Sequence, residues 1–402
     1  MTLAFALLVT PITIRSVQAQ TFTVLHRFTG ARSGDGTLPE AGLVRDAAGN
    51  LYGTTQYGGT GCPIFVAPLQ LVVFGCGVVF RVAANGAETL LHRFGAAFPT
   101  TKDGKYPVAS LLRDSAGNIY GTTRLGGAFG WGAVFKLYPS GLEIVLHSFT
   151  NGADGGQPFG NVIRDVDGNL YGTTAAGGAF KNGMVFKLNT TDKETVLHSF
   201  TGGADGREPF GGLVRDPAGN LYGTTAGGGA FGNGTVFKLD TTGKEIVLHS
   251  FTSGADGSSP DAGLIRDSAG NLYGATTSGG AFGNGTVFKL NSTGKETVLH
   301  SFTGGADGGQ PFAGLVRDAA GNLYGTTAGG GAFKKGTVFK LDTTGKEIVL
   351  HSFTGGAGGS TPHGGLVRDA AGNLYGTTAF GGDSSCFDPY GTGCGTVFKL
   401  AP

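Results

Sequence analysis

One position of the repeat is apolar in four copies and titratable in the other three. The three titratable residues are of types suited to acid–base chemistry. A proline precedes each of seven repeated strands, and the residue after that proline is Glu40, Asp261 or His363 in three of the repeats. A carboxylate beside an imidazole can exchange protons with a substrate near neutral pH. Glu40 and His363 belong to the first and last repeats, which become neighbours in a closed ring. The alternative is tolerated variation at a solvent-exposed position. The apolar residues in the other repeats are Val108, Phe159, Phe210 and Phe312.

The strands that carry these residues follow from a phrase that the chain repeats seven times. Its sixth copy reads RDAAGNLYGTT at 317–327. Five of the six intervals between equivalent tyrosines are 51 residues, and the first is 68. Repeats of about 40–50 residues are typical of β-propeller blades. The tyrosines are Tyr52, Tyr120, Tyr171, Tyr222, Tyr273, Tyr324 and Tyr375.

Each repeat contains four strand-like segments and no helical period. In the sixth repeat they are 314–318, 322–327, 336–341 and 347–353, all rich in Val, Leu, Phe, Tyr or Thr and bounded by Gly and Asn. The Asp and Gly of the repeated phrase suit a tight turn, because Asp caps such turns and Gly tolerates positive φ. Four strands joined by short turns predict one antiparallel propeller blade.

The two ends of the repeat array complement one another. The segment TFTVLHRF at 21–28 is a fourth strand without its blade, and GTVFKLAP at 395–402 is a third strand without a successor. Pairing them closes the ring and removes the exposed sheet edges. The sequence therefore predicts an all-β fold: one seven-bladed β-propeller over residues 20–402, with four-stranded blades and the N-terminal strand completing the last blade.

The repeat resembles a known family. The segment PFAGLVRDAAGNLYGTTAGGGAFKKGTVFKLDTTGKEIVLHSFTGGAGG at 311–359 is similar to the GloVer tandem repeat of exported choice-of-anchor bacterial proteins, and the resemblance covers essentially residues 21–402. A looser similarity to NHL-type blades implies that GLVRD is the innermost strand and VLHSF the outermost. The resemblance implies exported repeat scaffolding and no particular activity. Members often carry a C-terminal surface anchor, and none is evident here.

The N-terminus and the charge balance narrow the location. An apolar run at 3–14 precedes a small-residue cleavage pattern at 17–19, so residues 1–19 are interpreted as a signal peptide, with a disordered leader as the alternative. The chain has 29 Lys+Arg against 28 Asp+Glu, which leaves no basic face for nucleic acid. No second apolar segment reaches membrane-spanning length. We expect a secreted or cell-surface monomer.

Four cysteines lie in two lengthened hairpins of the first and last repeats. An exported chain favours disulfides, and local pairing is the simplest of the three possible connectivities. A zinc site built from the four thiolates is the alternative, and its spacing does not match a zinc ribbon. The expected pairs are Cys62–Cys76 and Cys386–Cys394.

Recurring histidines and loop aspartates are interpreted as structural. Seven His lie at equivalent outer-strand positions, so they cannot converge on one metal, and no other ligand type is expected beside them. Neither a metal nor a cofactor is therefore predicted. Six repeats carry an Asp in the loop before the inner strand, including Asp103 and Asp154, for which turn capping is favoured over an acidic binding ring.

Aromatic residues at the hairpin tips are a candidate binding surface. Phe129 lies at the tip of the second repeat, and equivalent Phe residues follow in the next four; Trp131 is the only Trp. Packing against the next blade is favoured, with stacking on a sugar or a partner as the alternative. Residues 63–75, between the first two Cys, are unusually apolar for a loop.

These observations predict an exported scaffold that binds a glycan, a wall component or a protein, without evident catalysis. The sector formed by the last, first and second repeats is the expected site. The alternative is an extracellular carbohydrate-active hydrolase or lyase that uses Glu40, His363 and Asp261. A third possibility is a purely structural or adhesive surface protein, since propellers host all three functions.

Overall fold

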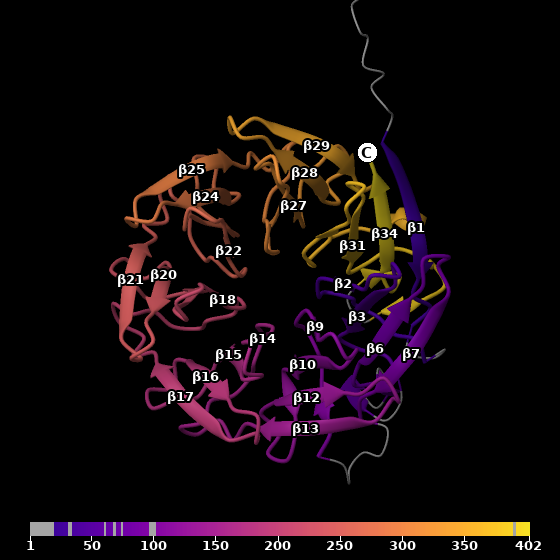
Figure 1. Cartoon of the computed structure of the whole chain (residues 1–402). Helices are drawn as coiled ribbons and strands as arrows, with labels where there is room; N and C mark the ends of the chain where they lie inside the picture. Colours follow the sequence, from indigo (N-terminus) through magenta and orange to yellow (C-terminus); the bar gives the residue numbers. More distant parts are fainter. Residues whose placement is uncertain are drawn as a thin grey trace, which may run out of the picture.

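The computed structural model describes residues 20–30, 34–59, 62–66, 70–73, 75–95, 102–388 and 391–402. The expected signal peptide at 1–19 lies outside these residues. The chain forms seven four-stranded antiparallel sheets arranged in a ring, as the repeats predict (Figure 1). The one helical segment in the described ranges is the 3-10 turn η1 (Gly356–Gly358). None of the described helices could cross a bilayer.

Each blade runs outward from the central channel in strand order. The blades are β2 (Val44–Arg45), β3 (Leu51–Thr55), β6 (Val78–Val82), β7 (Glu88–Arg93); β9 (Leu112–Arg113), β10 (Ile119–Thr123), β12 (Ala133–Leu137), β13 (Glu143–Ser148); β14 (Ile163–Arg164), β15 (Leu170–Thr174), β16 (Met184–Leu188), β17 (Glu194–Ser199); β18 (Val214–Arg215), β19 (Leu221–Thr225), β20 (Thr235–Leu239), β21 (Glu245–Ser250); β22 (Ile265–Arg266), β23 (Leu272–Thr276), β24 (Thr286–Leu290), β25 (Glu296–Ser301); β26 (Val316–Arg317), β27 (Leu323–Thr327), β28 (Thr337–Leu341), β29 (Glu347–Ser352); and β30 (Val367–Arg368), β31 (Leu374–Thr378), β34 (Thr396–Ala401), β1 (Thr21–Arg27).

Six shorter strands decorate the ring. Two form a hairpin between the first pair of cysteines, and two lie between the second pair. The other two pair the loop before the second blade with the start of the hairpin that follows its second strand. They are β4 (Pro63–Val66), β5 (Gln70–Val73), β32 (Phe387–Asp388), β33 (Gly391–Thr392), β8 (Gly104–Lys105) and β11 (Leu125–Gly126).

The repeated phrase builds the turn between the first two strands of each blade. In the sixth blade the backbone N–H of Asn322 donates to Asp318 Oδ1 at 2.9 Å, and its side-chain amide donates to Oδ2 at 2.7 Å. The hydroxyl of Tyr324 donates to the same Oδ2 at 3.0 Å, and Gly321 adopts a φ of +93°. One carboxylate therefore fixes the turn and the start of the next strand.

The hydrophobic core lies between adjacent blades. Tyr324 and Val338 of the sixth blade pack with Leu366 and Phe398 of the seventh. The rings of Phe353 and Phe398 meet edge to face, with centroids 5.3 Å apart. Each junction buries one such cluster, so the blades are held together mainly by apolar contacts.

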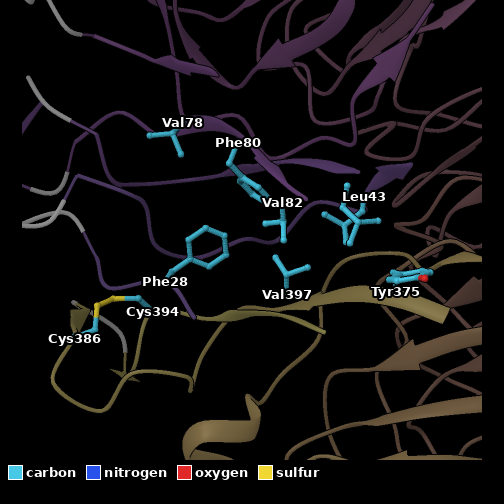
Figure 2. Close-up of a cluster of buried hydrophobic side chains, with 10 residues drawn as sticks. Phe28, Leu43, Val78, Phe80, Val82, Tyr375, Cys386, Cys394 and Val397 are labelled. Carbon is cyan, nitrogen blue, oxygen red and sulfur yellow. A yellow bond between two sulfur atoms is a disulfide. The ribbon is translucent and has the colours of Figure 1, made fainter. Parts of the chain in front are cut away.

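The N-terminal strand closes the ring. β1 lies antiparallel to β34, with Phe22 opposite Leu400 and Arg27 opposite Thr396 (Figure 1). The next residue, Phe28, packs on Phe80 of the first blade with ring centroids 5.0 Å apart (Figure 2). The predicted closure is thus confirmed.

The residue before each loop proline has a left-handed backbone conformation and links neighbouring blades through hydrogen bonds. Glu208, for example, donates its N–H to the Asn182 carbonyl of the preceding blade and accepts from Ala226 of its own blade, both at 3.0 Å. These two bonds fix the backbone from which the residue after the proline projects. The seven residues, with φ between +54° and +59°, are Leu38, Tyr106, Gln157, Glu208, Ser259, Gln310 and Thr361.

Candidate functional site at the channel mouth

The residues that follow the seven prolines meet at one end of the central channel. They line a single cavity of about 500 Å³. The short inner strands, among them β2, β9, β14, β18 and β22, surround this opening (Figure 1). The lining residues at this position are Glu40, Val108, Phe159, Phe210, Asp261, Phe312 and His363.

Glu40 and His363 are in direct contact. His363 Nδ1 lies 3.2 Å from Glu40 Oε1, and each side chain is 27% exposed. When Glu40 is ionised, the imidazole donates from Nδ1 and leaves Nε2 available to another group. The ring of Phe312 meets His363 edge to face at 5.1 Å and so limits its movement. The pair has the geometry of a base with its orienting partner, or of a polar binding pair.

Asp261 occupies the same cavity in the fifth blade. Its Oδ2 accepts from Thr277 Oγ1 at 3.1 Å. Burial raises the pKa of Asp261 to about 6; the hydrogen bond from Thr277 opposes this shift, and the charge of Glu208 adds to it. The carboxyl group therefore changes charge close to neutral pH.

Four further polar residues line the cavity, and the sequence reasoning missed them. Gln56 and Arg124 stand where four blades carry Ala, and Ser110 and Asn161 stand where the other five carry Gly. The Arg124 guanidinium lies over the ring of Phe159 at 4.9 Å. Each of the four differs from the residue that most repeats carry at its position. A comparison of the repeats, position by position, could have identified them.

The hairpin tips are exposed and lie apart from the residues that line the cavity. Phe129 is 60% exposed and Trp131 is 37% exposed. The expectation that the tip Phe residues pack against the next blade was therefore wrong. The equivalent side chains are also exposed: Phe180, Phe231, Phe282 and Phe333.

The loop aspartates act as turn caps. Thr150 donates its N–H to Asp154 Oδ2 at 2.9 Å and its hydroxyl to Oδ1. Asp103 accepts instead from the Gly95 N–H at 2.8 Å.

Outer-strand histidines contact carboxylates across the blade junctions. In six junctions His Nε2 lies 3.2–3.7 Å from the loop Asp. The Glu that begins the next outer strand lies nearby, at 4.0 Å from Nε2 for His147 and Glu194. The expectation that no other ligand type lies beside these histidines was wrong, because the contact joins two repeats. The seven His lie on different blades, as predicted.

These glutamates make stability depend on pH. Burial raises the pKa of each to about 7: Glu88, Glu143, Glu194, Glu245, Glu296 and Glu347. An acid whose pKa is higher in the folded chain than its usual 4.5 favours folding while it is protonated. That contribution is complete below about pH 4.5 and is lost as the pH rises toward 7.

Glu296→Gln is therefore expected to raise the melting temperature at pH 8 and to leave it nearly unchanged at pH 4.5. The gain is limited to about 1 kcal/mol, because Glu296 is partly exposed and water screens its charge. Thermal unfolding at both pH values measures the effect. Asp192→Asn, at an exposed position, is the control; an equal gain in both variants would contradict the explanation.

Both lengthened hairpins are closed by local disulfides. Cys62 pairs with Cys76 and Cys386 with Cys394, with Cα–Cα distances of 5.3 and 5.8 Å. The expected connectivity is confirmed. The apolar stretch between the first pair forms β4 and β5, and its side chains lie outside the described part of the chain.

The chain is similar to solved structures of other proteins. A putative 6-phosphogluconolactonase from Bacteroides uniformis is 16% identical with a TM-score of 0.50, over 78% of this chain and 84% of that chain. A putative gluconolactonase is 13% identical with a TM-score of 0.43, over 96% and 92% of the two chains. At 16% identity the likeness to the putative 6-phosphogluconolactonase shows the fold alone. No curated protein matches the sequence.

The repeat itself identifies the family. The family model described as the Gloeobacter/Verrucomicrobia repeat matches residues 69–269 and 247–402, which together cover most of the chain. The seven similar blades are the structural counterpart of that repeat. The chain belongs to the Gloeobacter/Verrucomicrobia repeat family.

Proposed function

We propose that this protein is an exported binding scaffold whose channel mouth holds a saccharide. The observation that carries the proposal is the convergence of departures from the repeat. Seven polar residues line one cavity, at positions where most other repeats carry Gly, Ala, Val or Phe. Neutral drift would not be expected to collect them there. They are Glu40, Gln56, Ser110, Arg124, Asn161, Asp261 and His363.

The chemistry of the lining favours a polyhydroxylated ligand. Phe159, Phe210 and Phe312 supply apolar faces against which the C–H groups of a sugar ring can stack. Carboxylate, amide and guanidinium groups around them can bind hydroxyls as donors or acceptors. A cavity of about 500 Å³ is in the range of small-ligand sites.

Export is proposed with this function. Two disulfides favour an oxidising compartment, and residues 1–19 have the pattern of a signal peptide. A glycan or wall component outside the cell is then within reach of the site. Sequencing the N-terminus of the protein recovered from the medium or the cell surface would test the proposed cleavage.

A glycan array followed by calorimetry tests the binding proposal. Arg124→Gln is expected to lower the affinity for the glycan that binds most tightly at least tenfold, because the loss of one charged hydrogen bond corresponds to about 1.5–3 kcal/mol. Trp131→Ala, at the hairpin tip, is the matched control and should leave affinity within about twofold. No glycan bound, or a larger loss in Trp131→Ala than in Arg124→Gln, would contradict the proposal.

A carbohydrate-active hydrolase or lyase is the second candidate. The 3.2 Å contact between Glu40 and His363, with Asp261 in the same cavity, favours it. Incubating the bound glycan with wild type and Glu40→Gln, followed by product analysis, separates the two functions. If wild type cleaves the glycan and Glu40→Gln binds it without cleavage, the result supports the enzyme. If both proteins leave the glycan intact, the result supports the binding scaffold.

A further inference from the structure

The junction between the first and second blades brings together three side chains that can bind a metal ion. His92 lies on β7, Asp103 lies in the loop that leads to the second blade, and Glu143 begins β13. One ligand atom from each lies within 4.8 Å of the other two. His92 Nε2 is 3.5 Å from Asp103 Oδ2. β7 and β13 are the outermost strands of their blades, so the cluster lies on the outer side of the ring and not at the channel lining.

Each of the three side chains has a buried atom without a hydrogen-bond partner among the described residues. The atoms are His92 Nε2, Asp103 Oδ1 and Glu143 Oε1. Buried polar atoms are normally paired, so three unpaired atoms in one cluster require an explanation. A cation in contact with all three would satisfy them together.

Equivalent junctions show why the aspartate is open here. In four of them a threonine hydroxyl donates to the Asp Oδ1, as Thr150 does to Asp154. The residue at the Thr position of this junction is Gly95. It has a φ of +71°, and a Cβ there would lie 2.5 Å from Cys76 Sγ. The packed disulfide therefore excludes threonine and leaves Asp103 Oδ1 without its usual donor.

The junctions on either side of the ring closure provide two contrasts. Ligand atoms of His26, Asp35 and Glu88 also lie within 4.8 Å of one another, but there both carboxylate oxygens of Asp35 are paired. Oδ1 accepts from the Gly30 N–H at 3.0 Å, and Oδ2 accepts from the N–H and the hydroxyl of Thr29. At the junction of the last two blades the loop residue is Gly358 in place of Asp, and β1 carries Phe22 in place of Glu.

Phe22 stacks on His351 at that last junction, with ring centroids 3.9 Å apart. The aspartate and the glutamate are thus absent together, and an aromatic ring covers the histidine instead. Of these sites, the His92 junction alone combines the full set of three side chains with an orphaned carboxylate oxygen on the loop aspartate.

We propose that His92, Asp103 and Glu143 bind one divalent transition cation of the zinc class. One imidazole nitrogen and two carboxylates suit zinc, whereas Ca²⁺ and Mg²⁺ favour sites made of oxygen ligands alone. The ligands come from two blades and the loop between them. The cation therefore clamps the first blade to the second beside the Cys62–Cys76 disulfide.

Calorimetric titration of the chelator-treated full chain with ZnCl₂ tests the site. We expect one zinc per chain and a melting temperature that rises when zinc is added. Asp103→Asn keeps an oxygen for the Gly95 N–H but removes the charge, and should weaken zinc binding at least tenfold. Asp256→Asn, at a junction where Thr252 donates to the aspartate, is the matched control and should leave zinc binding unchanged.

Glu143→Gln is the second variant, so that the test survives if Asp103→Asn fails to fold. Co²⁺ substitution gives an independent readout, because visible absorption bands report a nitrogen–oxygen ligand set and should disappear in Glu143→Gln. The proposal would be overturned if zinc failed to bind wild type, or if both test variants bound zinc as tightly as wild type. A stoichiometry of six zinc ions per chain would also overturn it. The last result would mean that the orphaned oxygen of Asp103 is irrelevant.

Discussion

Removal of residues 20–27 is expected to open the ring and to abolish the monomeric, cooperatively melting protein. The deletion takes away β1, the outer strand of the last blade, and exposes the edge of β34. It also removes Phe22, which packs against Phe353 and Phe398. The lost burial of Phe22, Val24 and Leu25 corresponds to about 3–6 kcal/mol. Exposed strand edges promote association, so aggregation should accompany the loss of stability.

Size-exclusion chromatography with light scattering, together with thermal unfolding, measures this result. The control is a permuted chain in which residues 20–27 follow Pro402 through a turn copied from 342–346. Because β1 would re-form beside β34 as a hairpin, we expect the permuted chain to regain the monomer and most of the melting temperature. A truncated chain that stays monomeric with an unchanged melting temperature would refute the importance of closure.

Phe288→Ala is expected to destabilise the fold by about 3–5 kcal/mol. Phe288 on β24 is completely buried, and its ring meets Phe251 of the preceding blade with centroids 5.2 Å apart. Gly274 on the neighbouring strand makes room for it, since a Cβ there would lie 2.6 Å from Phe288 Cζ. Truncation leaves a cavity between two sheets that are each held on both sides and cannot easily collapse.

Urea unfolding of Phe288→Ala and of Phe282→Ala makes the comparison within one hairpin. Phe282 lies at the tip between β23 and β24 and is 60% exposed, so its truncation should change stability by no more than about 0.5 kcal/mol. The explanation fails if both variants lose stability equally. It would then be the hairpin as a whole, and not the packing between blades, that sets the stability.

Most of the architecture can be predicted from the sequence because each repeat contains the residues that form its own turns. The Asp–Asn–Tyr hydrogen bonds and the Gly with positive φ are local, so the phrase around Asp318 predicts the turn without knowledge of neighbouring blades. Closure is predictable for a different reason: the strand at 21–28 has no local partner. The proximity of Glu40 and His363 follows from closure alone.

Contacts that cross a blade junction are much harder to predict. The approach of His92 to Glu143 depends on how two sheets are staggered, and no residue pattern within one repeat records that stagger. Arg124 was overlooked because a single departure carries no periodic signal. The error at Phe129 has another physical cause: a hairpin tip surrounded by glycines extends beyond the sheets, so an apolar side chain there has nothing to pack against.

The antiparallel pairing of β1 with β34 also determines how the molecule bears mechanical load. Thr21 lies opposite Ala401, so the outer ends of the two strands lie side by side (Figure 1). Tension applied between these ends acts across the strands and separates them one rung at a time, as in unzipping. The same strands pulled along their length would share the force over every rung. Under tension between these two ends, we therefore expect the ring to open first at the pair of strands that closes it.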